Sequence, residues 1–223
     1  MIQILPSVLS SNNADYGEKI SQIEESGAFD DAWIHVDFMD NVFVPNKSVE
    51  IDALKLYPSN FHIEAHLMVA DAEDWAQELV ETGVERIIFH VETIDNDELM
   101  KKIKAQDVEV GIAINPETPV ATITPYLHTI DTVLVMSVKP GFSGQEFIKG
   151  SIEKIKEISH LRSEEKLEFK IQVDGGVSAE NINQLIQAKV DRVIIGSKLL
   201  EGDINENLET IWEKYEQEFA PGT

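Results

Sequence analysis

Short apolar runs alternate with amphipathic segments along this chain of 223 residues. The apolar runs are rich in Val, Ile, Phe and Leu, which is typical of β-strands. The runs "TVLVM" and "RVIIG" are apolar at successive positions, as in parallel strands that are covered on both faces. The pattern predicts eight strands, near residues 3–6, 33–37, 62–66, 86–90, 109–114, 132–136, 169–174 and 192–195.

Segments with helical spacing separate these runs. Tyr16, Ile20 and Ile23 occur at positions i, i+4 and i+7 of a helix that Gly27 should end. Ser178 is a candidate N-cap for a later helix. The remaining stripes predict helices that carry Trp75 and Leu79 before Gly83, then Leu99 and Ile103, then Ile152, Ile155 and Ile158, then Ile182, Leu185 and Ile186, and last Ile204, Leu208, Ile211, Trp212, Tyr215 and Phe219.

Strict alternation of strands and helices leads either to an open doubly wound sheet or to a closed barrel. Eight such units in a chain of this length favour the barrel. No linker or low-complexity segment interrupts the series. We therefore expect an α/β protein with a single (β/α)8 TIM-barrel domain over residues 1–223.

The charges within the predicted strands gather at their carboxyl ends. The second strand ends in His35 and Asp37, the third in His66, the fourth in His90, and the seventh in Asp174. His35 and Asp37 lie two residues apart, so their side chains point to the same side of the sheet. The carboxyl ends of the strands form the working face of such barrels. We therefore expect all charge within the strands to lie at this one rim.

Two histidines and two carboxylates at one rim form a candidate metal site. The chain has no cysteine, so His35, Asp37, His66 and Asp174 would be the ligands. Imidazole and carboxylate ligands suit one divalent ion such as Zn, Fe, Mn or Co. Asp37 and Asp174 on either side of the ion also suit acid–base chemistry, because one can take a proton from a carbon beside a carbonyl while the other returns a proton to the opposite face.

Glycines mark the ends of the sixth, seventh and eighth strands, in the segments "PGFSGQ", "DGG" and "GS". Backbone N–H groups in such loops can bind a phosphate, and Lys139 and Lys198 lie nearby. Three methionines near strand ends could form an apolar lining under a substrate. The candidate substrate residues are thus Gly141, Phe142, Ser143, Gly144, Gly175, Gly176, Gly196, Ser197, Met39, Met68 and Met136.

The composition narrows the range of partners. A net charge of −23 argues against nucleic acid and against an anionic membrane, because both need a basic patch on the protein. The start of the sequence has no basic segment followed by an apolar one, and no apolar run approaches the length of a membrane span. We expect a cytoplasmic protein that acts on a small molecule. The sequence leaves the oligomeric state open, and a homo-oligomer is compatible with it.

The segments "PSVLS", "HVDFMDNVFVPN", "HLMV", "NPETP", "VMSVKPGFSGQ", "VDGG" and "GS" occur in an order that resembles the ribulose-phosphate 3-epimerases. The resemblance runs from Pro6 to about Leu200. It implies a barrel isomerase of the ribulose-phosphate-binding type that interconverts D-ribulose 5-phosphate and D-xylulose 5-phosphate through a metal-stabilised enediolate. It also implies the four metal ligands named above, Asp37 and Asp174 as the acid–base pair, and sugar contacts from Ser7 and His66. Asp40 would have a supporting role.

This chain departs from the family pattern at Asn41, Ser143 and Lys198, where the family usually has small residues. None of these positions is a predicted metal ligand, but they bear on substrate preference. A 3-epimerase of a six-carbon ketose phosphate, such as D-allulose 6-phosphate, is therefore an alternative. A barrel that only binds a sugar phosphate is a remote alternative, because Asp37 and Asp174 are both present.

Overall fold

The computed structural model describes residues 2–29 and 32–219, with side chains in the last helix described as far as Tyr215. All neighbouring strands are parallel, they follow one another in sequence order, and β8 pairs with β1 to close the barrel. The predicted TIM barrel is thus confirmed. The strands are β1 (Gln3–Val8), β2 (Trp33–Met39), β3 (His62–Met68), β4 (Arg86–His90), β5 (Glu109–Ile114), β6 (Thr132–Met136), β7 (Lys170–Asp174) and β8 (Arg192–Ile195).

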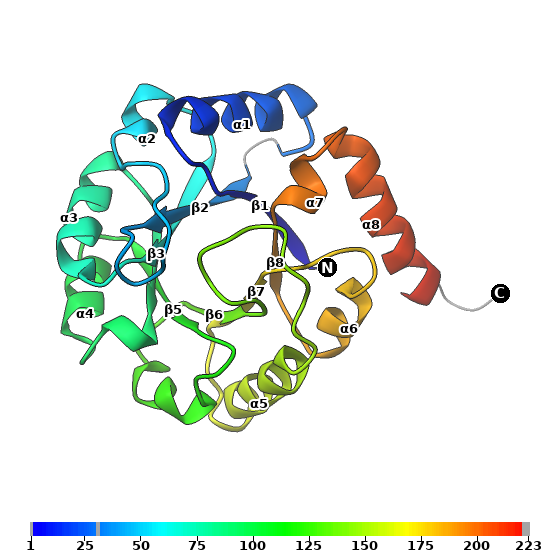
Figure 1. Cartoon of the computed structure of the whole chain (residues 1–223). Coiled ribbons are helices and arrows are strands. Elements are labelled where there is room, and N and C mark those ends of the chain that lie inside the picture. The colour runs from blue at the N-terminus through cyan, green and yellow to red at the C-terminus, as the bar shows by residue number, and fades with distance from the viewer. Residues whose placement is uncertain (1, 30–31, 220–223) are drawn as a thin grey trace.

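Helices form a ring around the barrel (Figure 1). Three short 3-10 helices, η1 (Val91–Thr93), η2 (Val120–Thr122) and η3 (Thr124–Tyr126), lie among the connections of the described chain. The α-helices are α1 (Asn13–Ser26), α2 (Ala53–Leu56), α3 (Ala72–Thr82), α4 (Glu98–Lys104), α5 (Ser151–Glu164), α6 (Ile182–Gln187), α7 (Ser197–Leu200) and α8 (Ile204–Phe219). None of the helices in the described part of the chain is long and apolar enough to cross a membrane.

Local sequence sets both ends of α1 and α3. The Asn12 side chain accepts a hydrogen bond from the Asp15 N–H at 3.0 Å and starts α1. Gly27 and Gly83 end α1 and α3 in the left-handed conformation, as their positions predicted. The N-cap prediction for Ser178 is wrong. Asn181 accepts a hydrogen bond from the Ser178 N–H and donates one to the Gly176 carbonyl, which holds a turn, and α6 begins only at Ile182.

The first three strands extend two residues beyond their predicted ends. In the second and third strands, the last ionisable residue, Asp37 or His66, resembled the end of the strand in the sequence. In the structure, however, β2 and β3 stay paired through Asp37 with His66 and on to Met39 with Met68. The charged side chains at this end therefore sit on continuous, hydrogen-bonded strands, and not on loops.

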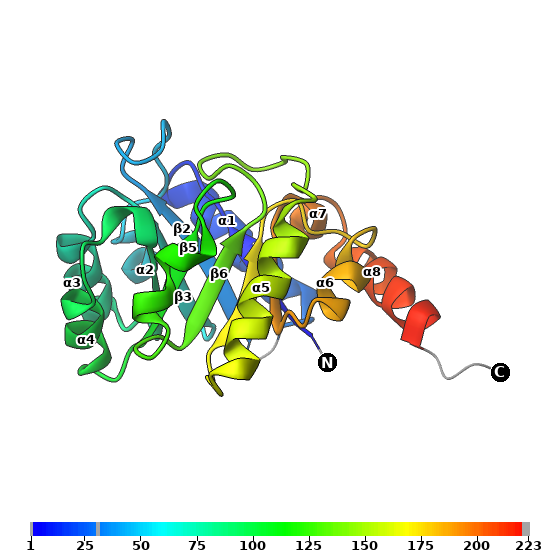
Figure 2. The same ribbon diagram turned by 90° about the horizontal axis from the view of Figure 1, so that it is seen from below.

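Apolar side chains fill the layer between the strands and the helices, and a separate apolar cluster occupies part of the barrel interior. The interior cluster consists of Leu5, Ile88, Ala113, Leu134, Met136 and Ile194. Seen from the side, the loops after β2 and β6 project from the same end of the barrel (Figure 2). This end holds the carboxyl termini of the strands.

Candidate active site

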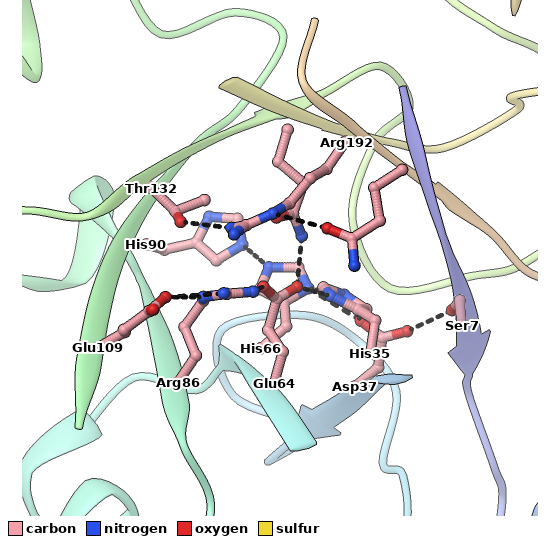
Figure 3. Close-up of polar contacts among 12 residues, drawn as sticks. Ser7, His35, Asp37, Glu64, His66, Arg86, His90, Glu109, Thr132 and Arg192 are labelled. Carbon is pink, nitrogen blue, oxygen red and sulfur yellow. Dashed lines mark hydrogen bonds and ion pairs between the residues drawn. The ribbon is translucent and has the colours of Figure 1, made fainter. Parts of the chain in front are cut away.

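Four side chains that could hold a metal ion converge at the carboxyl ends of β2, β3 and β7. His35, Asp37, His66 and Asp174 each offer one ligand atom, and these atoms lie within 4.8 Å of one another. His35 Nε2 is 3.3 Å from both Asp37 Oδ1 and His66 Nδ1, and His66 Nδ1 is 2.8 Å from Asp37 Oδ1. Figure 3 shows how the two imidazoles and the Asp37 carboxylate face one another. The structure thus brings together the four residues that the sequence singled out.

The two aspartates have opposite pKa shifts. Burial by itself would raise the pKa of Asp37, but the imidazoles of His35 and His66 outweigh it and hold that pKa well below its usual range. Burial and the nearby negative charge of Asp37 raise the pKa of Asp174 to about 6. No hydrogen bond reaches the Asp174 carboxylate within residues 2–29 and 32–219. One carboxylate is therefore held ionised, while the other exchanges its proton near neutral pH.

The charge of His35 follows from its acidic neighbours. Burial alone would lower the pKa of this imidazole, but the carboxylates of Asp37 and Glu64 outweigh it and raise the pKa to about 10. In the absence of a metal ion, His35 therefore carries a proton at neutral pH. A cation at the cluster would take the place of that proton, since a ligating imidazole must be neutral.

A cavity of about 1000 Å³ opens at the cluster. Asp37 and Asp174 contribute to its wall, while the fully buried His35 and His66 do not line it. His66 thus lies where it can ligate an ion, but not where it would line a substrate cavity. The other predicted substrate residues all line it: Ser7, Met39, Met68, Met136, Gly141, Phe142, Ser143, Gly144, Gly175, Gly176, Gly196 and Ser197.

The loops after β6 and β7 approach each other so closely that only glycine fits at two positions. A Cβ on Gly176 would lie 2.5 Å from the Phe147 backbone nitrogen, and one on Gly175 would lie 2.4 Å from the Val138 side chain. Both glycines also have positive φ angles. The side chain of Asn46, from the loop after β2, donates a hydrogen bond to the Gly141 carbonyl at 2.8 Å and ties that loop to the β6 loop.

The cavity wall carries three lysines as well as acidic residues, among them Glu146, Glu180 and Glu201. Lys198 lines the cavity, as its place beside the eighth strand suggested, but Lys139 is not among the lining residues. Lys19 and Lys149 also line it, and neither stands out in the sequence. Asp40 accepts hydrogen bonds from the N–H groups of Val42, Phe43 and Ala70, so its role is to shape the β2 loop.

The prediction that all charge within the strands lies at one rim is wrong. Glu64 and Arg86 are fully buried in the barrel interior, and they lie at the amino-terminal side of His66 and His90 on their own strands. His90 also joins the cluster, because its Nε2 lies 2.9 Å from His66 Nε2. The sequence did contain a signal for the inward direction of these side chains, because alternate residues of a strand share a face. Glu64 lies two residues before His66, and Arg86 lies two residues before Ile88 and four before His90.

Solved structures of other proteins share this architecture. The chain superposes on 3-keto-L-gulonate-6-phosphate decarboxylase from Vibrio cholerae with a TM-score of 0.67 and 14% identity, covering 99% of both chains. It superposes on 3-hexulose-6-phosphate synthase from Salmonella typhimurium with a TM-score of 0.63 and 14% identity, covering 97% of this chain and 99% of the other. At these identities the likeness concerns the fold alone. Fold and site together define a TIM-barrel enzyme with its polar centre at the carboxyl ends of the strands.

Comparison of the sequence identifies a family, which likeness of fold alone does not. The model of the ribulose-phosphate 3 epimerase family matches residues 3–200. The ribulose-phosphate 3-epimerase of Bacillus subtilis is 34% identical over 202 residues, which cover 88% of this chain and 91% of that protein. The ribulose-phosphate 3-epimerase of Treponema pallidum is 33% identical over 204 residues, which cover 90% of this chain and 92% of that protein. The chain belongs to the ribulose-phosphate 3-epimerase family, and it is accordingly an isomerase.

The close approach of the two loops leads to a testable difference between glycines. We expect Gly176→Ala to lower the free energy of unfolding by more than about 2 kcal/mol, because the new Cβ adds a backbone clash to the cost of a positive φ. Gly202→Ala is the matched control, since Gly202 has a φ of 85° and no atom lies within 4 Å of the place that its Cβ would take. Chemical denaturation of both variants measures the difference, and equal losses would contradict the packing argument.

Proposed function

We propose that this chain is a metal-dependent epimerase that inverts carbon 3 of D-ribulose 5-phosphate to give D-xylulose 5-phosphate. The observation that carries the proposal is the pair of carboxylates at one cavity, Asp37 from β2 and Asp174 from β7, with pKa values shifted in opposite directions. A base and an acid separated in this way suit the removal of a proton from one face of a carbon and its return to the other. Membership of the epimerase family supports the same reaction.

In this mechanism the two aspartates exchange roles with the direction of reaction. Asp37, which is held ionised, takes the proton from carbon 3 in one direction, while Asp174 supplies a proton from the opposite face. The Ser7 hydroxyl donates a hydrogen bond to Asp37 Oδ2 at 3.2 Å and helps to keep this carboxylate in place. In the reverse reaction Asp174 is the base and Asp37 the acid.

The residues at the centre fit a divalent metal ion. Two imidazole nitrogens and two carboxylate oxygens form a suitable donor set for Zn, Fe, Mn or Co. The raised pKa of Asp174 reflects its burial and then the negative charge of Asp37, which a cation would neutralise. When bound, such an ion supplies a Lewis acid that stabilises negative charge on the substrate oxygens. His35, Asp37, His66 and Asp174 would hold it.

The rest of the cavity suits a sugar phosphate. Gly144, Gly176 and Ser197, which follow β6, β7 and β8, line the cavity, and backbone N–H groups at such positions can bind a phosphate despite the net charge of −23. Met39, Met68 and Met136 are nearly fully buried and present an apolar wall that limits water around the reacting carbon.

A substrate comparison tests the proposed reaction. Purified protein loaded with a divalent metal should turn over D-ribulose 5-phosphate with a kcat/KM at least about tenfold above that for D-allulose 6-phosphate, because family membership favours the five-carbon substrate. A coupled assay with both substrates measures this ratio. Preference for the six-carbon substrate would keep the mechanism and change the substrate, and turnover of neither would contradict the proposal.

Replacing Asp174 tests the acid–base assignment. Asp174→Asn should lower kcat by about 10²–10⁴-fold, because the amide cannot exchange the proton, while the fold persists. Asp203→Asn is the matched control: Asp203 is exposed and starts α8 by accepting two N–H hydrogen bonds, which asparagine can also accept. Activity of Asp174→Asn within tenfold of the unmodified protein would show that Asp174 has another role.

Metal binding should be coupled to proton release from His35. The folded pKa of this imidazole is about 10, above its ordinary value, so the metal-free site is protonated at pH 8 and the ligand must lose that proton. Calorimetric titration with Zn²⁺ at pH 8, in buffers of different ionisation enthalpy, should show about one proton released per ion.

Apparent metal affinity should therefore rise with pH from about 7 towards 10 and then level off.

Removal of the ion with a chelator should abolish turnover, and a divalent cation should restore it. Full turnover by protein that holds no metal in elemental analysis would overturn the metal site.

A further inference from the structure

A chain of buried polar contacts leads from His35 down to the amino-terminal end of the barrel. His35 Nδ1 lies 2.5 Å from Glu64 Oε1, and the other oxygen of Glu64 accepts a hydrogen bond from Arg86 Nη1 at 2.6 Å. Arg86 Nε in turn donates to Glu109 Oε2 at 2.7 Å. Gln172 Nε2 also donates to Glu64 Oε1. Figure 3 shows Glu109, Arg86 and Glu64 in a row that leads to His35.

The register of two strands creates the contact with His35. β2 and β3 are paired so that His35 lies beside Glu64 and Asp37 lies beside His66. Since alternate residues share a face, all four side chains point into the barrel. Each predicted ligand on β2 therefore has a neighbour on β3, and Glu64 is the neighbour of the first one.

Glu64 has an unusual environment for a carboxylate. It is fully buried, and so are its three partners His35, Arg86 and Gln172. The Arg86 guanidinium lies over the Trp33 ring, 3.8 Å from its centre, in a cation–π contact. A buried carboxylate is costly unless it is fully paired, so these contacts keep Glu64 charged and leave it little freedom to move.

The contact also determines which nitrogen of His35 faces the cluster. With Nδ1 bonded to Glu64, Nε2 is the ring atom that lies 3.3 Å from Asp37 Oδ1 and from His66 Nδ1. A carboxylate that accepts the Nδ1 proton keeps the lone pair of a neutral imidazole on Nε2, where a metal ion would be. Glu64 itself does not line the cavity.

We propose that Glu64, held by Arg86 and Gln172, is a positioning residue that orients His35 so that Nε2 is presented to the metal ion. This assignment rests on the proposed metal site. Glu64 acts through His35 and touches neither substrate nor ion. Arg86 and Gln172 hold Glu64 in the orientation that His35 requires.

Glu64→Gln tests the assignment, because it keeps the shape of the side chain and removes the charge that the Nδ1 proton of His35 faces. We expect Zn²⁺ affinity, measured by competition with a chromophoric chelator, to fall by about 10- to 100-fold. KM should stay within about twofold, since Glu64 lies outside the cavity wall, while kcat should fall at limiting metal and recover when Zn²⁺ is in excess.

Glu109→Gln is the matched control. It makes the same chemical change on the other carboxylate partner of Arg86, but Glu109 is not in contact with His35 and its side chain is 46% exposed. Zn²⁺ affinity should change by less than about twofold in this variant. In zinc-loaded protein with ¹⁵N-labelled histidine, the Nδ1–H signal of His35 should shift in Glu64→Gln and not in Glu109→Gln.

The outcomes separate this assignment from the proposed function. Zn²⁺ affinity of Glu64→Gln within twofold of the unmodified protein would overturn the positioning role, and so would an equal loss in Glu109→Gln. If the unmodified protein bound no Zn²⁺, the proposed metal site would itself be wrong, and the assignment would fall with it.

A second variant covers the case in which Glu64→Gln does not fold because Arg86 loses its buried partner. Glu64→Gln combined with Arg86→Met removes both buried charges, so that no uncompensated charge remains. The same loss of Zn²⁺ affinity is expected in the double variant, and unchanged affinity would overturn the assignment.

Discussion

The register of β2 against β3 is the constraint on which the rest of the site depends. It places His35 beside Glu64 and Asp37 beside His66, all on the inner face of the barrel. A slip of one residue would turn each of these side chains toward the helices, since side chains alternate between the two faces of a strand. The apolar residues between them, such as Val36 and Ala65, point outward into the core and oppose such a slip, because a slip would place them inside the barrel among charges.

Pairing of opposite charges inside the closed barrel offsets part of the cost of burying them. Around His35 and Glu64 each charged group faces a group of opposite charge, and the chain of contacts ends at the half-exposed Glu109. Asp174 is the exception, with a raised pKa and no hydrogen bond to its carboxylate in the described part of the chain. This unpaired carboxylate lies at the cavity, where a bound cation and substrate would provide its missing partners.

The acidity of the whole protein and the chemistry of its cavity are separate matters. The net charge of −23 belongs to the whole chain. In the cavity wall, Lys19, Lys149 and Lys198 lie among the acidic residues Asp37, Asp174, Glu146, Glu180 and Glu201, and the loops after β6, β7 and β8 contribute glycines beside them. Local dipoles and charges decide binding at short range, because screening weakens distant charges. An acidic protein can therefore bind an anion.

The sequence by itself determined the eight strands, the ends of α1 and α3 at Gly27 and Gly83, and the four clustered residues His35, Asp37, His66 and Asp174, because periodicity and glycine position are local properties. It did not determine where the first three strands end, or where α6 begins, because strand pairing and the contacts of Asn181 decide these. Only the tertiary structure placed Glu64 against His35 and His90 against His66. These contacts join residues of different strands, and they exist only once the barrel closes in its particular register.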